Sequence, residues 1–319
     1  MGHRISFDLD AAAADAIVRG LPGSPTLAGV TPLTGGGSEL FRLELQDASP
    51  VVLKVYPDAP KWGPRKEVLV AGWMDGALDV PTPRLVRFDE SRTLLPLVYA
   101  VFTWTAGSDL RSYFSAPDLE DAYRQMGALL RRVHRVPMPA YGYILDEGVS
   151  DPKPTNAIYM AGAIEGALRK FRSLGGDVGL ARELEQILQG GMDLMAESAG
   201  PVLCHDDFHP GNLLFVREEA GRLRLSGLID FGNARAGDAL MDLAKALFCS
   251  KHEDPRSSVP LMEGYGPIDH SDPDRALWLY TLFHRVTMWN WLTALGADPG
   301  SPTGPGGLLR DLHEMARAS

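Results

Sequence analysis

The hydrophobic period of this 319-residue chain changes near residue 105, and this change constrains the fold more than any other feature. Before it, most segments are short and alternate apolar with polar residues, which is typical of strands. After it, apolar residues mostly recur at three- and four-residue intervals, which indicates helices. We therefore predict an α+β fold with two lobes, a small antiparallel β-sheet lobe with one helix and a large, mostly helical lobe.

The boundaries of the two lobes follow from the same pattern. The N-terminal lobe spans residues 1–102, a hinge spans 103–107, and the C-terminal lobe spans 108–319. Strands of the first lobe are expected at 26–33, 38–46, 51–56, 83–89 and 94–104, with a helix at 64–74 that has Pro64 in its first position. Helices of the second lobe are expected at 119–136 and near 155–174, 178–198, 237–250, 273–296 and 306–317, with a strand at 201–205 and a hairpin at 213–231.

The charge of the chain limits its partners. It carries 31 Lys and Arg against 41 Asp and Glu, a net charge of −10, of which residues 103–319 contribute −8. A net acidic chain lacks the basic face that binds nucleic acid or an anionic membrane, so we expect neither partner. Only Cys204 and Cys249 occur, and no apolar leader or membrane-length segment is present, so we expect a cytoplasmic protein.

The strongest local signal is CHDDFHPGNLLF at 204–215, followed by LIDFG at 228–232. His205, Asp207 and Asn212 follow the order His-x-Asp-x-x-x-x-Asn, and Asp230 opens Asp-Phe-Gly. Phosphoryl transfer needs one carboxylate at the acceptor hydroxyl as base, and an amide oxygen and a second carboxylate to hold Mg²⁺. A loop between short strands lets Asp207 and Asn212 face one cleft, and the next strand delivers Asp230 beside them.

These segments resemble the aminoglycoside phosphotransferase and choline kinase family, which has a protein-kinase-like fold. The family usually has His-Gly-Asp at the start of this motif, and here Asp206 replaces the common Gly. Of the two neighbouring carboxylates, only Asp207 has the five-residue step to Asn212. The resemblance is strong over 201–245 and weak over 1–100, and it covers nearly the whole chain.

The resemblance implies a role for each residue of the motif. Asp207 would be the catalytic residue that orients and deprotonates the acceptor hydroxyl. Asn212 and Asp230 would hold Mg²⁺, an ion that prefers such oxygen ligands. His205 would brace the catalytic loop without acting as an acid or base.

Two neighbouring patterns have other interpretations. His205 and His209 have the four-residue spacing of a zinc-binding helix, but the Pro-Gly step that follows would break that helix, so we expect no zinc. Residues 237–244 are similar to the family's Gly-Asp-Pro-x-x-Asp-Leu-Ala. This similarity implies that Asp238 caps a helix and that Asp242 is structural.

The first lobe would supply contacts to the nucleotide. Lys54 is a charged residue in the apolar strand VVLKVY, where a lone lysine can also reach solvent from a sheet edge. Beside the motif, it looks like the family's strand lysine that contacts the α- and β-phosphates. Glu67 is the only acidic residue in 59–74 and is the candidate that orients Lys54.

Two loops of the first lobe are further candidates. The Gly-rich turn before the Lys54 strand, with Gly36, Gly37 and Ser38, is either a plain hairpin turn or a cover for phosphates through its backbone N–H groups. AVFTWTAG at 100–107 resembles the family's hinge, which implies that Thr103 and Thr105 offer backbone groups to adenine and that Phe102 is the gatekeeper.

The acceptor implied by the family is a hydroxyl of a small molecule, often a cationic one. Acidic side chains in the second lobe would attract ammonium groups, although each can also be ordinary solvated surface. These residues are Glu253, Asp254, Glu263, Asp269, Asp272 and Asp274. The expected helix at 273–296 is rich in aromatic residues, which core packing explains, while one Trp could form a cation–π wall.

The sequence therefore predicts an enzyme, an ATP- and Mg²⁺-dependent O-phosphotransferase. It would transfer the γ-phosphate to a hydroxyl of a small cationic molecule of aminoglycoside type, as in antibiotic resistance. ATP is the expected donor, with GTP left open. The alternatives are a metabolite kinase acting on choline, homoserine or a sugar, and a nucleotide-binding pseudokinase, which the complete set of motif residues disfavours. A protein kinase is disfavoured because residues 230–238 are too few for an activation loop.

Overall fold

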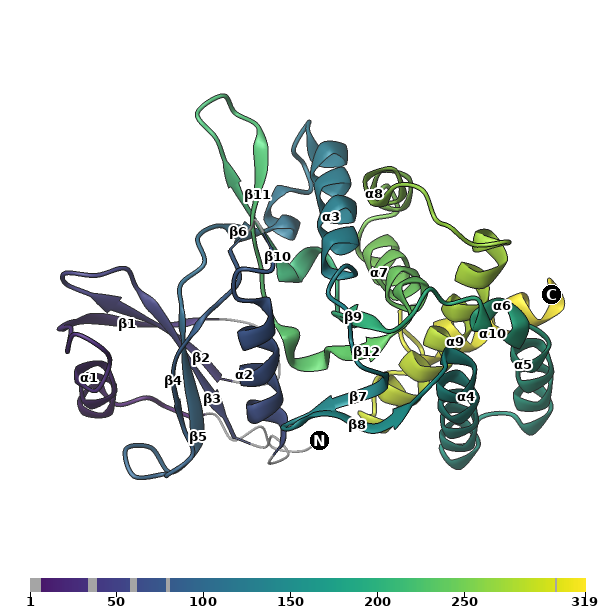
Figure 1. Cartoon of the computed structure of the whole chain (residues 1–319), viewed down its shortest axis with the longest axis horizontal. Coiled ribbons are helices and arrows are strands. Elements are labelled where there is room, and N and C mark those ends of the chain that lie inside the picture. The colour runs from purple at the N-terminus through teal and green to yellow at the C-terminus, as the bar shows by residue number, and fades with distance from the viewer. Residues whose placement is uncertain (1–6, 34–38, 58–61, 79–80, 302) are drawn as a thin grey trace.

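The computed structural model describes residues 7–33, 39–57, 62–78, 81–301 and 303–319, and it has the two lobes expected (Figure 1). The first lobe is built on a five-stranded sheet with the strand order β1-β2-β3-β5-β4. Every neighbouring pair in this sheet is antiparallel. The strands are β1 (Leu27–Leu33), β2 (Glu39–Leu45), β3 (Val51–Tyr56), β4 (Leu85–Asp89) and β5 (Val98–Thr103).

Two helices lie against the first sheet, α1 (Ala11–Arg19) and α2 (Trp62–Met74). Alternate residues of β3, among them Leu53 and Val55, are buried in a cluster with α1. Because successive strand side chains point to opposite faces, Lys54 lies on the other face, toward α2. Helix α2 begins two residues earlier than predicted, because Pro64 is tolerated throughout a first turn, where its missing N–H has no helical partner.

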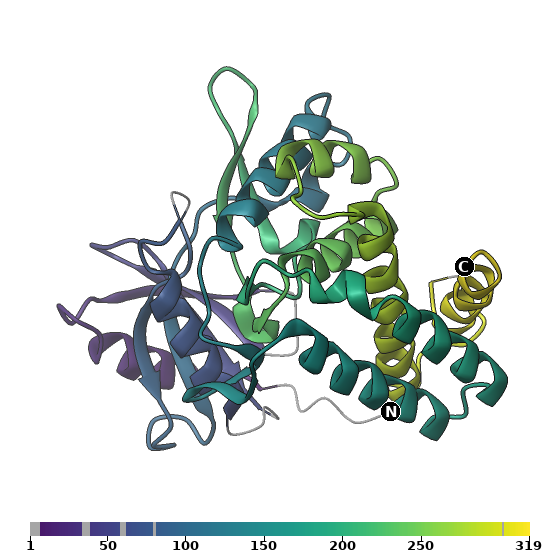
Figure 2. The ribbon, with the colours of Figure 1, turned by 45° about the vertical axis from the view of Figure 1, so that its right-hand side comes forward.

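The second lobe is mostly helical, as Figure 2 also shows. Helix α3 buries the apolar face expected from its spacing and packs closely against α8, a helix that the sequence patterns did not single out. None of the described helices is long and apolar enough to cross a membrane. The helices are α3 (Leu119–Val133), α4 (Asn156–Ser173), α5 (Val178–Gly190), α6 (Met192–Ala196), α7 (Ala239–Glu253), α8 (Ser258–Tyr265), α9 (Pro273–Ala294) and α10 (Pro305–Arg317).

Two small sheets support the motif segments, with the strand orders β11-β10-β6 and β8-β7-β12-β9. The sequence patterns did not predict the β7–β8 hairpin, because β8 is polar and β7 is interrupted by Gly142. The strands are β6 (Ser108–Asp109), β7 (Tyr141–Leu145), β8 (Gly148–Lys153), β9 (Val202–Cys204), β10 (Leu213–Arg217), β11 (Leu223–Leu228) and β12 (Arg235–Gly237). Short 3₁₀ helices are η1 (Leu110–Tyr113), η2 (Pro210–Asn212) and η3 (Phe231–Asn233).

Candidate active site

Lys54 meets two carboxylates at the boundary between the lobes. Its Nζ lies 2.7 Å from Glu67 Oε1 on α2 and 3.4 Å from Asp230 Oδ1, which precedes η3. The hydroxyl of Tyr56 donates to the other oxygen of Glu67 at 2.9 Å. Burial alone would lower the pKa of Lys54, but Glu67 and Asp230 outweigh it and raise the pKa. The structure therefore brings the predicted pair together and keeps the lysine charged.

The loop of residues 205–212, which the sequence predicts to be the catalytic loop, runs from β9 into η2. Within it, the Asn212 side-chain amide donates to the backbone oxygen of Asp207 at 2.9 Å. The Asp207 carboxylate accepts from the Asn233 amide at 3.2 Å, and its side chain is 31% exposed. Asp207 is thus the carboxylate of this loop that is held in place and still accessible.

Asp206 has a different environment. Its side chain is 2% exposed and forms ion pairs with Arg235 and with Lys245, whose Nζ lies 3.2 Å from Asp206 Oδ1. Burial alone would raise the pKa of Asp206, but Arg235 and Lys245 outweigh it and lower the pKa. Its φ of +56° lies in the left-handed region that favours glycine, which is the family's usual residue here. The two neighbouring carboxylates are therefore separated by burial, and only Asp207 is open.

His205 and Asp242 hold the start of the catalytic loop from inside. His205 Nε2 lies 3.1 Å from the backbone oxygen of Ile229, and its ring packs against Phe231. Asp242 accepts from the backbone N–H groups of His205 and of the next residue, at 2.7 and 2.8 Å. Asp242 also lies 3.0 Å from His134 Nε2 at the end of α3. These contacts suit the bracing role of His205 and the structural role of Asp242 that the sequence predicted.

Asn212 and Asp230 supply oxygen atoms from adjacent strand ends. The backbone N–H of Ile229 donates to the Asn212 backbone oxygen at 3.1 Å, which ties the two segments together. Burial raises the pKa of Asp230, but Lys54 and His205 outweigh it, so the pKa is lowered and the carboxylate is ionised. Among the described residues, no group of three or more His, Cys, Asp and Glu side chains could hold a metal ion. A pair of oxygen donors fits Mg²⁺, which usually keeps phosphate and water oxygens in its shell.

The predicted hinge residues form hydrogen bonds and packing contacts within the protein that the sequence did not indicate. Thr103 pairs with Arg84 twice, because its backbone N–H donates to the Arg84 oxygen and its hydroxyl accepts from the Arg84 N–H, both at 2.9 Å. Thr105 is 5% exposed and packs against Gly227, where a Cβ would come within 2.2 Å of its methyl carbon. Phe102 is buried in a small cluster between the sheet and α2. The candidates Gly36, Gly37 and Ser38 lie outside the described residues.

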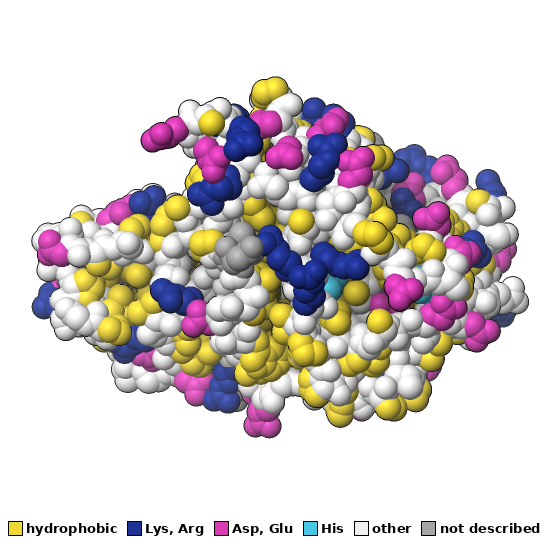
Figure 3. Space-filling view, turned by 45° about the horizontal axis from the view of Figure 1, so that its top comes forward, with side chains coloured by type: hydrophobic (Ala, Val, Ile, Leu, Met, Phe, Trp, Pro, Cys, Tyr) yellow, Lys and Arg dark blue, Asp and Glu magenta, His cyan; other side chains and the backbone are white. Residues whose placement is uncertain are grey.

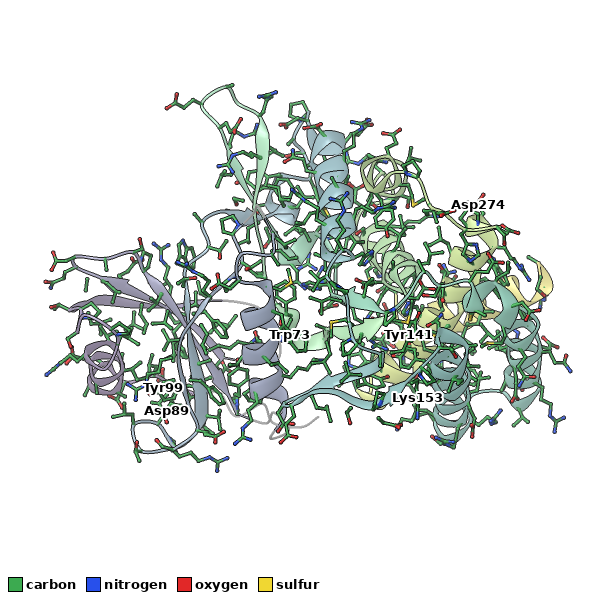
Figure 4. The ribbon with its side chains drawn as sticks, viewed as in Figure 1. Trp73, Asp89, Tyr99, Tyr141, Lys153 and Asp274 are labelled. Carbon is green, nitrogen blue, oxygen red and sulfur yellow. The ribbon has the colours of Figure 1, made fainter. Side chains whose placement is uncertain are left out.

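Most of the acidic stretch in the second lobe already has partners. Glu253 pairs with Arg111, Asp254 with Arg256, and Glu263 with Arg124. Asp272 caps α9 by accepting from the backbone N–H of Arg275 at 3.0 Å. On the face drawn in Figure 3, Lys and Arg side chains gather in a cluster near the centre, and the acidic side chains lie mostly toward the edges. Asp274 lies at the far end of the second lobe from Tyr99 of β5 (Figure 4).

A groove of about 720 Å³ opens between the β7–β8 hairpin, α4 and α9. It is mainly apolar, and Tyr143 and Trp291 on its wall are 54% and 58% exposed. The guanidinium of Arg235 lies 4.8 Å above the Tyr143 ring and donates to the Tyr159 hydroxyl at 3.2 Å. Because Arg235 also pairs with Asp206, its side chain contacts both the wall of this groove and the loop of residues 205–212. A smaller hollow, near Arg256 and the start of α3, lies elsewhere.

Sequence patterns missed several residues of this neighbourhood. Asn233 and Arg235 follow the Asp-Phe-Gly motif directly, and their polarity beside it was a usable signal. His134 and Arg111 gave no local signal, because their partners Asp242 and Glu253 are more than a hundred residues away. Contacts of that kind depend on the packing of distant elements.

Comparisons with known proteins give a family and a fold. The model of the phosphotransferase enzyme family matches residues 29–279. A crystal structure of aminoglycoside phosphotransferase APH(4)-Ia is 16% identical, with a TM-score of 0.70, and the match covers 97% of this chain and 99% of that one. A candidate fructosamine-3-kinase from Thermobifida fusca YX-ER1 is 22% identical, with a TM-score of 0.69 and coverage of 98% and 100%.

A third similar structure is a ternary complex. It contains a thermostable mutant of APH(4)-Ia with AMP-PNP and hygromycin B, and it is 16% identical with a TM-score of 0.69. The match covers 97% of this chain and 99% of that one. A search of curated protein sequences gave no match. The family match spans well over half of the chain, and this protein therefore belongs to the phosphotransferase enzyme family and has its bilobal kinase-like fold.

Proposed function

We propose that this enzyme is an ATP- and Mg²⁺-dependent O-phosphotransferase that acts on a hydroxyl of a small molecule. The observation that carries the proposal is the separation of two adjacent carboxylates, of which Asp206 is buried in ion pairs and Asp207 is accessible. Asp207 also lies in one loop with Asn212, and Asp230 adjoins the Lys54–Glu67 pair. These groups supply a base, oxygen donors for a metal and a cation for phosphates.

In the proposed reaction, the acceptor oxygen forms a bond to the γ-phosphorus while the bond to the β–γ bridging oxygen breaks, and ADP leaves with that electron pair. Asp207 orients the acceptor hydroxyl and takes its proton, while Asn233 holds the carboxylate in place. Lys54, kept charged by Glu67, binds phosphate oxygens. Asn212 and Asp230 would hold Mg²⁺, which supplies charge neutralisation at the phosphate oxygens.

The groove beside Arg235 supports a place for the rest of the acceptor. Exposed aromatic faces such as those of Tyr143 and Trp291 stack on ring-shaped ligands and attract ammonium groups. Asp151 is the acidic residue among those that line the groove, and Lys153 Nζ donates to its Oδ1 at 2.7 Å. We therefore place the acceptor ring in this groove, with the reacting hydroxyl directed past Arg235 toward Asp207.

Two acceptor classes remain in the proposal. The cationic, aminoglycoside-like acceptor, with a role in antibiotic resistance, is supported by the aromatic faces and by the similarity to a structure that holds hygromycin B. A sugar-like metabolite is supported by Lys153 and Lys170 on the groove wall and by the similarity to a candidate fructosamine-3-kinase. Glu253, Asp254 and Glu263 each form an ion pair with an arginine, so these three carboxylates do not support a cationic acceptor.

The catalytic assignment is tested by Asp207→Ala. We expect turnover to fall by about 10²- to 10⁴-fold, because a positioned general base contributes that much, while ATP binding survives. Steady-state ADP release and ATP titration calorimetry measure the two quantities. Asp193→Ala changes an aspartate of α6 outside the site and serves as the matched control. Turnover by Asp207→Ala at the wild-type rate would remove the assignment.

The acceptor class is tested by a compound panel. Acceptor-stimulated ADP release is measured with aminoglycosides, amino alcohols including choline and homoserine, and neutral sugars, with ATP and GTP as donors. Stimulation by aminoglycosides supports the cationic acceptor, and stimulation confined to sugars supports the metabolite kinase. Nucleotide binding without stimulation by any compound would support the pseudokinase instead.

A further inference from the structure

The groove between the β7–β8 hairpin, α4 and α9 is lined by side chains whose charges limit what can bind there. The charged residues of its lining are Asp151, Lys153 and Lys170. Asp151 accepts from Lys153 Nζ at 2.7 Å, so this pair adds no net charge. Lys170 on α4 is exposed and leaves the lining with a positive charge. Among the described residues that line the groove, no carboxylate is therefore left to pair with an ammonium group of a ligand.

Arg235 adds a second, buried positive charge behind the wall of the groove. Its guanidinium carbon lies 4.8 Å from the centre of the Tyr143 ring, and its Nη1 donates to the Tyr159 hydroxyl at 3.2 Å. Both tyrosines line the groove. Asp206 pairs with Arg235 and also with Lys245, so one carboxylate serves two cations. The Tyr143 ring is thus already in contact with a cation, which would repel an ammonium group stacked on the same ring.

The surroundings of Arg235 are positive overall. Lys66 of α2 is 4% exposed, and burial together with the charge of Arg235 lowers its pKa to about 8. Asp206 and Glu67 act in the opposite sense, but they do not outweigh these two effects. A positive potential of this kind opposes the entry of a cation and accepts neutral or anionic groups.

Two uncharged groups of the lining can each form a further hydrogen bond. Asn290 is 6% exposed, and its Nδ2 donates to the Ala167 oxygen at 2.9 Å, whereas its Oδ1 has no hydrogen-bond partner among the described residues. The Tyr159 hydroxyl accepts from Arg235, which leaves its own proton to donate. Burial raises the pKa of Tyr159 to about 12, so the hydroxyl keeps that proton at neutral pH. An acceptor and a donor in a mainly apolar groove suit the hydroxyl groups of a neutral ligand.

We propose that the groove takes an acceptor with an apolar ring face that is neutral or anionic, and that Arg235 excludes compounds with an ammonium group on that ring. The inference rests on the proposed phosphotransfer and decides between its two acceptor classes, in favour of a sugar-like molecule with an apolar substituent. Tyr143 and Trp291 would stack on the apolar ring. Specificity then comes from the repulsion of one class as well as from the attraction of the other.

The experiment compares three glycosides that differ only in the charge of one ring: phenyl β-glucoside, its 4-aminomethyl analogue and its 4-carboxy analogue. Isothermal titration calorimetry of the wild-type protein gives each Kd without any need for turnover. We expect the ammonium analogue to bind at least about 10-fold more weakly than the neutral glycoside, because like charges meet in the groove. We expect the carboxylate analogue to bind at least as tightly as the neutral glycoside. Equal or tighter binding of the ammonium analogue would overturn the inference, and so would no binding of the neutral glycoside.

Substitutions on the wall assign this binding to the groove. We expect Tyr143→Ala and Trp291→Ala each to raise the Kd of phenyl β-glucoside by about 3- to 10-fold through loss of ring stacking. We expect Lys170→Glu to narrow the gap between the ammonium and neutral glycosides by up to about fivefold. Arg182→Glu makes the same charge change at an exposed residue of α5 and is the matched control, with wild-type Kd values. Wild-type affinity in both aromatic variants would place the binding elsewhere and overturn the inference.

Arg235→Gln tests the source of the exclusion. Glutamine keeps a polar side chain near Tyr159 but removes the charge, so we expect the ammonium analogue to regain about 10-fold in relative affinity. The melting temperature without ligand shows whether the variant is folded. A folded Arg235→Gln variant that excludes the ammonium analogue as strongly as wild type would overturn the role of Arg235. If this variant does not fold, Lys170→Glu decides the electrostatic argument, which an unchanged gap between the two glycosides would overturn.

The inference and the proposed function fail in different ways. Phosphorylation of aminoglycosides by a protein that does not bind the neutral glycoside would remove the inference alone. The expected order of Kd values, without ADP release for any compound, would remove the proposed function and leave the groove as a ligand site. A wild-type dimer in analytical ultracentrifugation that Trp291→Ala makes monomeric would assign the groove to a second copy of the chain and overturn the inference.

Discussion

Asp206 shows how one residue can carry strain and still be stabilised. A residue other than glycine in the left-handed region costs about 1–2 kcal/mol. Asp206 has a φ of +56° and therefore carries this strain. Its carboxylate forms ion pairs with Arg235 and Lys245, whose side chains are themselves largely buried. Removing one partner of a buried ion pair costs about 3–5 kcal/mol, because the remaining charge is left buried without compensation, so loss of the Asp206 carboxylate would leave two buried cations unpaired. The same pairing takes Asp206 out of competition with Asp207.

Asp242 predicts how stability depends on pH. Burial alone would raise its pKa, but the hydrogen bond and charge of His134, together with His205 and the backbone N–H of Asp206, bring the pKa to about 2. Because this lies below the usual 3.8, the stabilisation is complete above pH 4 and is lost as the pH falls toward 2. From the linkage relation it amounts to on the order of 2 kcal/mol at pH 7.

The test is the gap in unfolding free energy between wild type and Asp242→Asn. Urea denaturation at pH 7 and pH 3 should show the gap narrowing by about 1 kcal/mol at the lower pH, since part of the carboxylate is then protonated in the unfolded state. A gap that is the same at both values would show that the charge of Asp242 does not stabilise the fold.

At the scale of elements, α3 and α8 pack backbone against backbone. A Cβ at Gly127 of α3 would lie 2.0 Å from the Leu261 oxygen, and one at Gly264 would lie 1.9 Å from the Arg124 oxygen. Both neighbours are backbone atoms, which cannot move aside as a flexible side chain can. The pairing of these helices therefore depends on two glycines that a helix pattern alone disfavours.

Gly127→Ala tests this packing against a matched substitution. We expect it to lower the unfolding free energy by about 1–3 kcal/mol, because overpacking forces the two helices apart. Gly72→Ala in α2 meets nothing within 4 Å, and we expect it to raise stability by up to about 1 kcal/mol through helix propensity. Urea denaturation of both variants measures the contrast, and equal effects of the two substitutions would contradict the close approach.

At the scale of the whole molecule, the Lys54–Asp230 contact at 3.4 Å joins the two lobes at the proposed nucleotide site. A ligand that binds only the native state stabilises it, by about 2.7 kcal/mol at a concentration one hundred times its Kd. We therefore expect ATP with Mg²⁺ to raise the melting temperature of the wild type by several degrees. The shift should be much smaller in Lys54→Ala at the same ATP concentration. An equal shift in both would show that Lys54 does not bind the nucleotide.

Much of this architecture could be predicted from the sequence. The alternation around Lys54 predicted the face on which it lies, and Glu67 was the candidate partner because it is the only acidic residue in 59–74, a pairing that the structure contains. The His-x-Asp-x-x-x-x-Asn order likewise placed Asp207 and Asn212 in one loop. Periodicity and motif spacing are local properties, and strands and helices convert them directly into position.

The state of each charged group was decided only by the tertiary structure. The acidic stretch of the second lobe looked available to a cation until folding paired Glu253 with Arg111 and with His209. The groove also exists only because the β7–β8 hairpin, α4 and α9 meet. The sequence thus determined the lobes and the order of the site residues, whereas the fold decided which carboxylates are free. The reason is that pairing across more than a hundred residues depends on packing, and no local pattern encodes it.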